Sequence, residues 1–300
     1  MASSASIAVI VNARAGAASA HPQLEADMVD LFHAAGVDVE IITLRDGEDV
    51  TEAARRASAR AGIVAAAGGD GTVSAVAAGL VDSSSALGIL PLGTLNHFAR
   101  DLRIPFDLQA AVAVVASGHV TRVDAGEVNG ALFVNNSSIG IYPSIVDERE
   151  ALRRNGHRKW PAMAIAIARV LRRYRGVTVT VEVDGQRRTR RTPFVFVGNN
   201  AYEIDGLRMG ERARLDQGQL FVYLAPRLRA HQLPLLLAKA LAGRARRSGD
   251  FEIVPAAEAW IDTARKRRWR VAYDGEVRVM RTPLHYRVRA GGLRVVVPAS

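Results

Sequence analysis

The stretch Ala65-Ala-Ala-Gly-Gly-Asp-Gly-Thr-Val-Ser-Ala75 decides how the first half of this chain folds. It continues an apolar run at residues 63–67 and leads into a helical pattern of small residues at 73–80. That order predicts a strand, a glycine turn and a helix. The glycines carry no Cβ, so the backbone can come close to a bulky ligand. Because N–H groups at a helix start favour negative charge, the turn predicts an anion-binding site.

Two side chains of this turn are suited to a nucleotide. Thr72 can donate its hydroxyl to a phosphate oxygen, and Asp70 offers a carboxylate that can hold Mg²⁺, usually through water. We therefore interpret the turn as the part of the chain that holds the phosphates of ATP. The alternative is a tight strand-to-helix turn in which Asp70 only fixes the loop, because short glycine motifs often match by chance.

Up to residue 122, apolar strands alternate with amphipathic helices. Continuous apolar runs such as residues 7–11 and 87–91 are typical of parallel strands covered on both faces. We therefore expect an α/β domain with a parallel sheet over residues 1–122. In such sheets ligands bind at the carboxyl ends of the strands. The polar elements at those predicted ends are Asn12, Thr43, residues 68–72 and residues 93–96.

After residue 122 the pattern changes to short strands. Asn129-Gly130 and Asp184-Gly185 each lie between strand-like runs, which is a hairpin signal. We expect an antiparallel β domain over residues 123–300, folded as a sandwich. The last strand, residues 293–298, suits either domain.

Composition narrows the setting of the protein without choosing its partner. The chain has 300 residues, no cysteine and a formal net charge of +10. Disulfides and thiolate metal sites are therefore excluded, and anionic partners such as a nucleotide or a membrane surface are favoured. The basic residues are poorly interleaved with aromatics, so we expect no nucleic-acid partner. The N-terminus lacks the pattern of a signal peptide, and no apolar run approaches the ~20 residues of a membrane span.

Two basic amphipathic segments interrupt the β domain, at residues 148–175 and 226–247. Basic residues around an apolar helical face suit a membrane interface. They equally suit a helix that packs on the core with solvated ends. Both interpretations stay open. We expect the protein in the cytoplasm, peripheral to the inner face of the membrane.

Several motifs occur together in a fixed order. Gly68-Gly-Asp-Gly-Thr72 and Gly93-Thr-Leu-Asn-His-Phe-Ala-Arg100 come first, and Asp216-Gln-Gly218 and Asp274-Gly-Glu276 follow. In this order they resemble the diacylglycerol kinase catalytic-domain family, which includes bacterial lipid kinases and the sphingosine and ceramide kinases. The resemblance covers roughly residues 5–298. It implies an ATP-dependent lipid kinase with a diacylglycerol- or sphingoid-type acceptor, using Mg²⁺, with the nucleotide in a cleft between the two domains.

The resemblance also implies roles for single residues. Glu276 is the expected base for the lipid hydroxyl, and Asp274 is a candidate to share that work or to engage Mg²⁺. If the strand stays extended there, the two carboxylates lie on one face. Asp-Gly is also an ordinary turn signal, and that alternative needs no catalysis. The residues implied at the nucleotide are Asn12, Thr43, Gly68, Gly69, Asp70, Gly71, Thr72, Thr94 and Asn96, with Arg14 as a further candidate and Asp70 also counted as catalytic.

One motif departs from the family pattern. Bacterial relatives often carry Asp-Asp-Gly near Leu215 and hold a structural Mg²⁺ there, whereas this chain has Asp216-Gln217-Gly218. A neutral amide binds a hard cation less well than a carboxylate. The site at Asp216 and Gln217 is therefore expected to be weakened or lost. We interpret His97 as a helix-start residue and not as a metal ligand.

Two other functions compete with the lipid kinase. An NAD kinase also uses a Gly-Gly-Asp-Gly-Thr turn in an α/β domain that precedes a β domain, although the motif at residues 93–100 argues against it. A nucleotide-responsive membrane-surface or nucleic-acid-binding protein without catalysis is the second alternative. The identity of the lipid stays open, and so does the oligomeric state, with a homodimer included.

Overall fold

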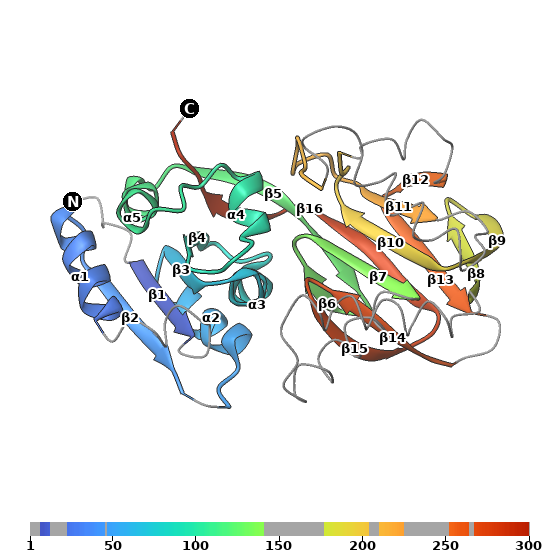
Figure 1. Cartoon of the computed structure of the whole chain (residues 1–300), viewed down its shortest axis with the longest axis horizontal. Helices are drawn as coiled ribbons and strands as arrows, with labels where there is room; N and C mark the ends of the chain where they lie inside the picture. The colour runs from blue at the N-terminus through green and yellow to red at the C-terminus, as the bar shows by residue number, and fades with distance from the viewer. Residues whose placement is uncertain are drawn as a thin grey trace.

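The computed structural model describes residues 7–12, 23–45, 47–140, 177–203, 210–224, 252–263 and 267–299. Figure 1 shows a helical end, which contains the N-terminal strands, and a β end, with two long strands running between them. The basic segments predicted at residues 148–175 and 226–247, and Arg14, lie outside the described residues. Within the described ranges, no helix has the length and apolar composition that crossing a bilayer requires.

The N-terminal strands form the predicted parallel sheet. Their order is β2-β1-β3-β4, and each pair of neighbours is parallel. The strands are β1 (Ile7–Asn12), β2 (Val39–Leu44), β3 (Ile63–Gly68) and β4 (Ala86–Pro91). The helices are α1 (Leu24–Ala34), α2 (Val50–Ser58), α3 (Asp70–Leu80), α4 (His97–Asp101) and α5 (Leu108–Ser117).

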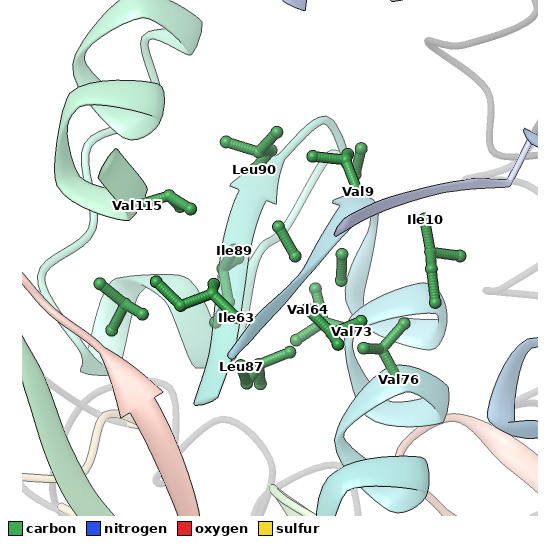
Figure 2. Packing of buried hydrophobic residues seen from close by; sticks show 14 of the residues in the cluster. Val9, Ile10, Ile63, Val64, Val73, Val76, Leu87, Ile89, Leu90 and Val115 are labelled. Atoms are coloured by element: carbon green, nitrogen blue, oxygen red, sulfur yellow. The ribbon is translucent and has the colours of Figure 1, made fainter. Parts of the chain in front are cut away.

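Helices cover both faces of this sheet, which explains the unbroken apolar sequence of its central strands. Helix α1 contacts α5, and α2 contacts α3. In Figure 2, Val73 and Val76 of α3 lie on one side of the strands and Val115 of α5 lies on the other. Every residue of β3 and β4 is buried. Because neither face of β3 or β4 meets water, their side chains do not alternate between polar and apolar.

Among the described residues, twelve further strands follow, and most belong to the β end. They are β5 (Val120–Val128), β6 (Ala131–Phe133), β7 (Asn136–Gly140), β8 (Val177–Val183), β9 (Gln186–Thr192), β10 (Phe194–Asn199), β11 (Leu220–Leu224), β12 (Glu252–Ala256), β13 (Glu258–Thr263), β14 (Arg268–Tyr273), β15 (Glu276–Arg281) and β16 (Leu284–Val296).

Tight turns connect three of the antiparallel pairs. Asn129-Gly130 joins β5 to β6 and Asp184-Gly185 joins β8 to β9, as the sequence predicts. Asp274-Gly275 joins β14 to β15 in the same manner. All six of these turn residues have positive φ, the requirement of the turn type whose twist matches that of the strands.

A single sheet runs through both ends of the molecule. Its main order is β2-β1-β3-β4-β16-β13-β8-β9, and β5 pairs with β16. Near its end β16 pairs in parallel with β4, and near its start it pairs antiparallel with β13. The boundary expected between residues 122 and 123 falls inside β5. The two domains are therefore joined by continuous strand pairing.

The second sheet completes the sandwich at the β end. Its order is β12-β11-β10-β7-β14-β15, and all its pairs are antiparallel. Val197 and Val271 from this sheet join Val181 and Ile261 from the long sheet in one buried cluster. The expectation of an α/β part followed by an antiparallel β part is therefore confirmed.

Candidate active site

The glycine turn lies between β3 and α3, as the sequence predicts. Gly69 is the residue that precedes α3, and as a glycine it offers the helix no side-chain cap. A Cβ placed on Gly68 would lie 2.6 Å from Thr72 Oγ1, and one on Gly69 would lie 3.3 Å from Gly93 Cα. A Cβ on Gly71 would meet nothing within 4 Å. Gly68 is therefore required by internal packing, whereas Gly71 faces open space.

The loop after β4 is bonded to the glycine turn. Asp70 Oδ1 accepts a hydrogen bond from the His97 backbone N–H at 2.7 Å. Asn96 has a left-handed backbone, with φ of 49°, and its side chain bonds both the N–H and the C=O of Gly93. His97 begins α4, as predicted. Asp70 thus fixes the start of α4 beside the start of α3.

The other residues that we predicted at the nucleotide differ in where they lie and in how exposed they are. Asn12 and Thr43 lie at or next to the carboxyl ends of neighbouring strands, and the exposed Thr43 hydroxyl donates to Glu25 Oε1 at 2.7 Å. Thr94 is exposed in the loop after β4. Thr72 is 5% exposed, and its side chain packs over Gly68. A direct bond from the Thr72 hydroxyl to a phosphate is therefore less favoured than a bond from the backbone at the helix start.

The Asp274-Gly275-Glu276 motif forms a turn, the second of the two arrangements that the sequence left open, and the strand is not extended there. Asp274 has φ of 44° and Gly275 has φ of 88°, so the chain reverses between them. The Asp274 carboxylate points inward and accepts the backbone N–H groups of Val134, Asn135 and Asn136 at 2.7, 2.9 and 3.1 Å. The two acids therefore do not share a face.

Burial and hydrogen bonding act in opposite directions on Asp274. Removal from water raises the pKa of its carboxyl, while the three backbone N–H groups and the Ser74 hydroxyl oppose that shift. A carboxylate held by several amides is a strong anchor for a turn. Asp274 therefore fixes the segment at residues 134–136 against the turn.

Glu276 points away from this anchor and is exposed. Tyr273 Oη and Arg278 Nη2 lie 3.5 and 3.4 Å from its Oε2. Burial raises the pKa of Tyr273 to about 12, and the Glu276 carboxylate adds to that rise. Tyr273 consequently stays protonated at neutral pH and can donate to Glu276.

A pocket of about 190 Å³ brings the two turns together. Its lining includes Gly71 from the first turn of α3 and Glu276 from the start of β15. The rest of the lining is Thr51, Arg55, Ser74, Ala75, Ala78, Gly130, Ala131, Leu132, Tyr273, Asp274 and Arg278. A proton acceptor and two arginines thus face the helix that follows the glycine turn, whereas Asn12, Thr43 and Thr94 are not among the lining residues.

The residues predicted as a weakened metal site are engaged elsewhere. Asp216 is exposed and pairs with Arg214, whose hydrogen bond lowers the pKa of the carboxyl. Gln217 Oε1 accepts the Ala201 backbone N–H at 3.1 Å. In the part of the chain that the structure describes, no group of three or more His, Asp or Glu side chains is placed to hold a metal ion. Both side chains therefore have other partners among the described residues, and a weakened site at Asp216 and Gln217 stays a prediction.

Sequence reasoning missed three buried charged residues near the cleft, Asp101, Asp124 and Arg212. Asp124 is 2% exposed and accepts the backbone N–H groups of Gly218 and Gly291 at 2.6 and 2.8 Å. Its signal in the sequence is a carboxylate inside an apolar strand, between Val123 and Ala125. Arg212 had no such signal, because a loop arginine in a chain with 40 basic residues looks like a solvated one.

Comparisons with known proteins agree with this architecture. The family model of the diacylglycerol kinase catalytic domain matches residues 6–128. A second model, the YegS C-terminal NAD kinase beta sandwich-like domain, matches residues 138–297. The two models together span most of the chain, which therefore belongs to the family of proteins that join a diacylglycerol kinase catalytic domain to a YegS-type C-terminal domain.

Individual relatives are also named diacylglycerol kinase. A diacylglycerol kinase of Staphylococcus saprophyticus is 41% identical over 100 residues, which are 33% of this chain and 33% of that protein. One from Staphylococcus aureus is 26% identical over 237 residues, covering 78% of this chain and 75% of the relative. A solved structure of a diacylglycerol kinase from Bacillus anthracis has a TM-score of 0.73 at 22% identity, covering 98% of this chain and 97% of the other. The match to the Staphylococcus saprophyticus relative thus spans about a third of that protein's length, and the Bacillus anthracis structure supports the fold alone.

Proposed function

We propose that the protein is an ATP-dependent lipid kinase that transfers the γ-phosphoryl group to the hydroxyl of a diacylglycerol- or sphingoid-type lipid. The observation that carries the proposal is the pocket in which Gly71 at the start of α3 faces Glu276 from the β end. Phosphoryl transfer needs positioning, charge stabilisation and a proton acceptor, with little covalent work from the protein. Family membership and the names of the relatives support the same reaction.

The start of α3 suits the phosphates of ATP. The helix lacks a side-chain cap, and the space beside Gly71 is open. The N–H groups of its first turn are therefore available to bind an anion. Asp70 is the carboxylate that would hold Mg²⁺ at this turn, and it keeps its own position through the bond to His97. When bound, Mg²⁺ supplies positive charge against the phosphate oxygens. Arg55 and Arg278 supply further positive charge at the pocket wall.

Glu276 is the residue that we assign to the proton of the acceptor hydroxyl. Its carboxylate lines the pocket, and Tyr273 and Arg278 hold its Oε2 from one side. Asp274 takes a positioning part, because its oxygens are occupied by backbone amides. This assignment differs from the one that the resemblance implied, in which Asp274 was a candidate to share the work of the base or to engage Mg²⁺.

The size of the pocket bears on how the acceptor binds. Sites that enclose a whole drug-sized ligand measure roughly 300–1,000 Å³. A pocket of about 190 Å³ therefore suits only the hydroxyl-bearing end of a lipid, which leaves the hydrocarbon chains outside it. That fits a peripheral enzyme on the cytoplasmic face of a membrane. The net charge of +10 favours such a contact with anionic lipid.

The test is a phosphoryl-transfer assay with labelled ATP and Mg²⁺. Diacylglycerol vesicles, sphingosine and NAD⁺ would be offered separately to the wild type and to Glu276→Gln. We expect label in a lipid product from the wild type and almost none from the variant. The description of the C-terminal domain as NAD kinase-like makes NAD⁺ the competing acceptor. Label in NADP⁺ alone would overturn the lipid assignment, and label in no acceptor would favour a protein without catalysis.

A further inference from the structure

Arg212 is a buried arginine at the junction between the helical end and the β end. Its side chain is 0% exposed, and that of its partner Asp101 is 5% exposed. Arg212 Nε donates to Asp101 Oδ2 at 2.8 Å, and Nη2 lies 2.7 Å from the same oxygen. The two residues are 111 positions apart in sequence. The pair therefore links regions that the fold alone has brought together.

The remaining donors of Arg212 point into the β end. Its Nη1 donates to the backbone oxygens of Val134 and Asn199 at 2.7 and 3.0 Å. Its Nη2 donates to Asn135 Oδ1 at 2.8 Å. All of these acceptors are buried. One guanidinium thus joins α4 to the segment between β6 and β7 and to the end of β10.

This arginine completes a chain of contacts between the two turns of the pocket. At one end, Asp70 bonds the first residue of α4, and Asp101 is the last residue of the same helix. At the other end, Arg212 contacts Val134 and Asn135, and residues 134–136 donate their N–H groups to Asp274. Asp274 in turn forms the turn that carries Glu276. The position of Asp70 is therefore mechanically connected to the position of Glu276.

Only a guanidinium satisfies this arrangement. Arginine presents five N–H donors in a rigid plane, whereas lysine has a single ammonium group on a flexible stem. The Arg212 plane also lies 5.8 and 5.4 Å from the ring centroids of Phe98 and Tyr202, which hold its orientation. A lysine keeps the charge opposite Asp101 but cannot reach all the other acceptors together.

We propose that Arg212 is a positioning residue that sets the alignment of the nucleotide turn with Glu276. The inference rests on the proposed function, because the alignment matters only if phosphate crosses between these two turns. Arg212 lies outside the lining of the pocket and acts through Asp101 and the segment at residues 134–136.

The first test compares two lysine variants, Arg212→Lys and the control Arg187→Lys. Arg187 forms an exposed pair with Glu182 on the β8–β9 hairpin, at the edge of the long sheet (Figure 1). We expect Arg212→Lys to lower kcat by roughly tenfold to a hundredfold, because a misplacement near 1 Å has effects of that size. Affinity for a fluorescent ATP analogue should stay at the wild-type value, because the phosphate contacts belong to one turn alone.

Two results of that comparison would overturn the proposal. One is a kcat for Arg212→Lys that matches the Arg187→Lys control. The other is a parallel fall of kcat, nucleotide affinity and melting temperature, which would indicate a purely structural role. If Arg212→Lys does not fold, Asp101→Asn takes its place, since it keeps one oxygen acceptor for the guanidinium and removes the charge together with the second acceptor. The same split between kcat and nucleotide affinity is expected, and the same two results would count against it.

The second test measures the distance between the helical end and the β end, and it does not depend on catalysis. The chain has no cysteine, so Ala59→Cys and Thr178→Cys, both at exposed positions, can carry a specific pair of spin labels. We expect a broader or shifted distance distribution in Arg212→Lys than in the wild type or in Arg187→Lys. An unchanged distribution would overturn the proposal. A wild type that phosphorylates no lipid would instead refute the proposed function, and the distances would still report on the alignment.

Discussion

The two Asp-Gly turns of the cleft use the same residue pair in different ways. In the first, Asp70-Gly71 begins a helix, and Asp70 bonds the backbone of the next loop. In the second, Asp274-Gly275 reverses a hairpin, and Asp274 accepts three backbone amides from residues 134–136. Both aspartates hold loops in place. Asp70 lies outside the lining of the pocket, and Asp274 lines it with its carboxylate oxygens occupied by backbone amides. The groups that the two turns make available to a substrate are therefore Gly71 and Glu276.

The largest expected effect is on the exposed acid of the second turn. Glu276→Gln should lower kcat by roughly a hundredfold to ten-thousandfold, the usual contribution of a general base. Because Glu276 is exposed, we expect the free energy of unfolding of the variant to differ from that of the wild type by less than ~0.5 kcal/mol. Transfer of label from ATP to lipid and a urea melt would measure the two quantities. A folded Glu276→Gln variant with the wild-type kcat would show that Glu276 takes no part in the reaction.

Two glycines of the first turn allow a matched pair of alanine substitutions. Gly68→Ala should destabilise the fold, because its Cβ would collide with Thr72, by about 1–3 kcal/mol as is usual for overpacking. Gly71→Ala should stabilise α3 by roughly 0.4–1 kcal/mol, since nothing opposes its Cβ and alanine favours the helix. If phosphates lie against Gly71, that more stable variant should nevertheless bind the ATP analogue more weakly. If Gly71→Ala binds the ATP analogue as tightly as the wild type does, the phosphates do not lie against this turn.

The smallest effect concerns Tyr273 and alkaline pH. Folding raises the pKa of Tyr273 from 10.0 to about 12, so between those values the folded state binds the proton and the unfolded state releases it. Stability must therefore fall as pH rises through that window. Tyr273→Phe removes this contribution and should lose less stability between pH 10 and pH 12 than the wild type does. Equal losses in urea melts across that window would show that Tyr273 lacks the environment described here.

Local sequence patterns predicted the regular parts of the molecule well. Apolar runs such as residues 63–67 identified parallel strands because burial on both faces leaves a direct trace in the sequence. Asn129-Gly130 and Asp184-Gly185 identified hairpins because their turns need positive φ. The glycine turn and the start of α4 at His97 were also placed correctly, because an apolar run followed by glycines and then a helical pattern marks a strand-to-helix turn.

Contacts between distant segments left no such trace. The pairing of β16 with both β4 and β13 depends on one long strand that local patterning cannot assign to a sheet. The inward direction of Asp274 depends on amides about 140 residues earlier in the chain. Arg212 is recognisable only once α4 and β10 are neighbours. The sequence therefore identified the glycine turn and the Asp274-Gly-Glu276 motif, which line one pocket, but not how each side chain is used there.

The most direct test of these two roles sets Asp274→Ala beside Glu276→Gln in one experiment, with the free energy of unfolding and kcat measured for both. We expect Asp274→Ala to lose about 2–4 kcal/mol of stability, because three backbone amides lose their acceptor, whereas Glu276→Gln should lose activity at wild-type stability. An Asp274→Ala protein as stable as the wild type, with kcat reduced as far as in Glu276→Gln, would contradict this expectation and place Asp274 in the reaction itself.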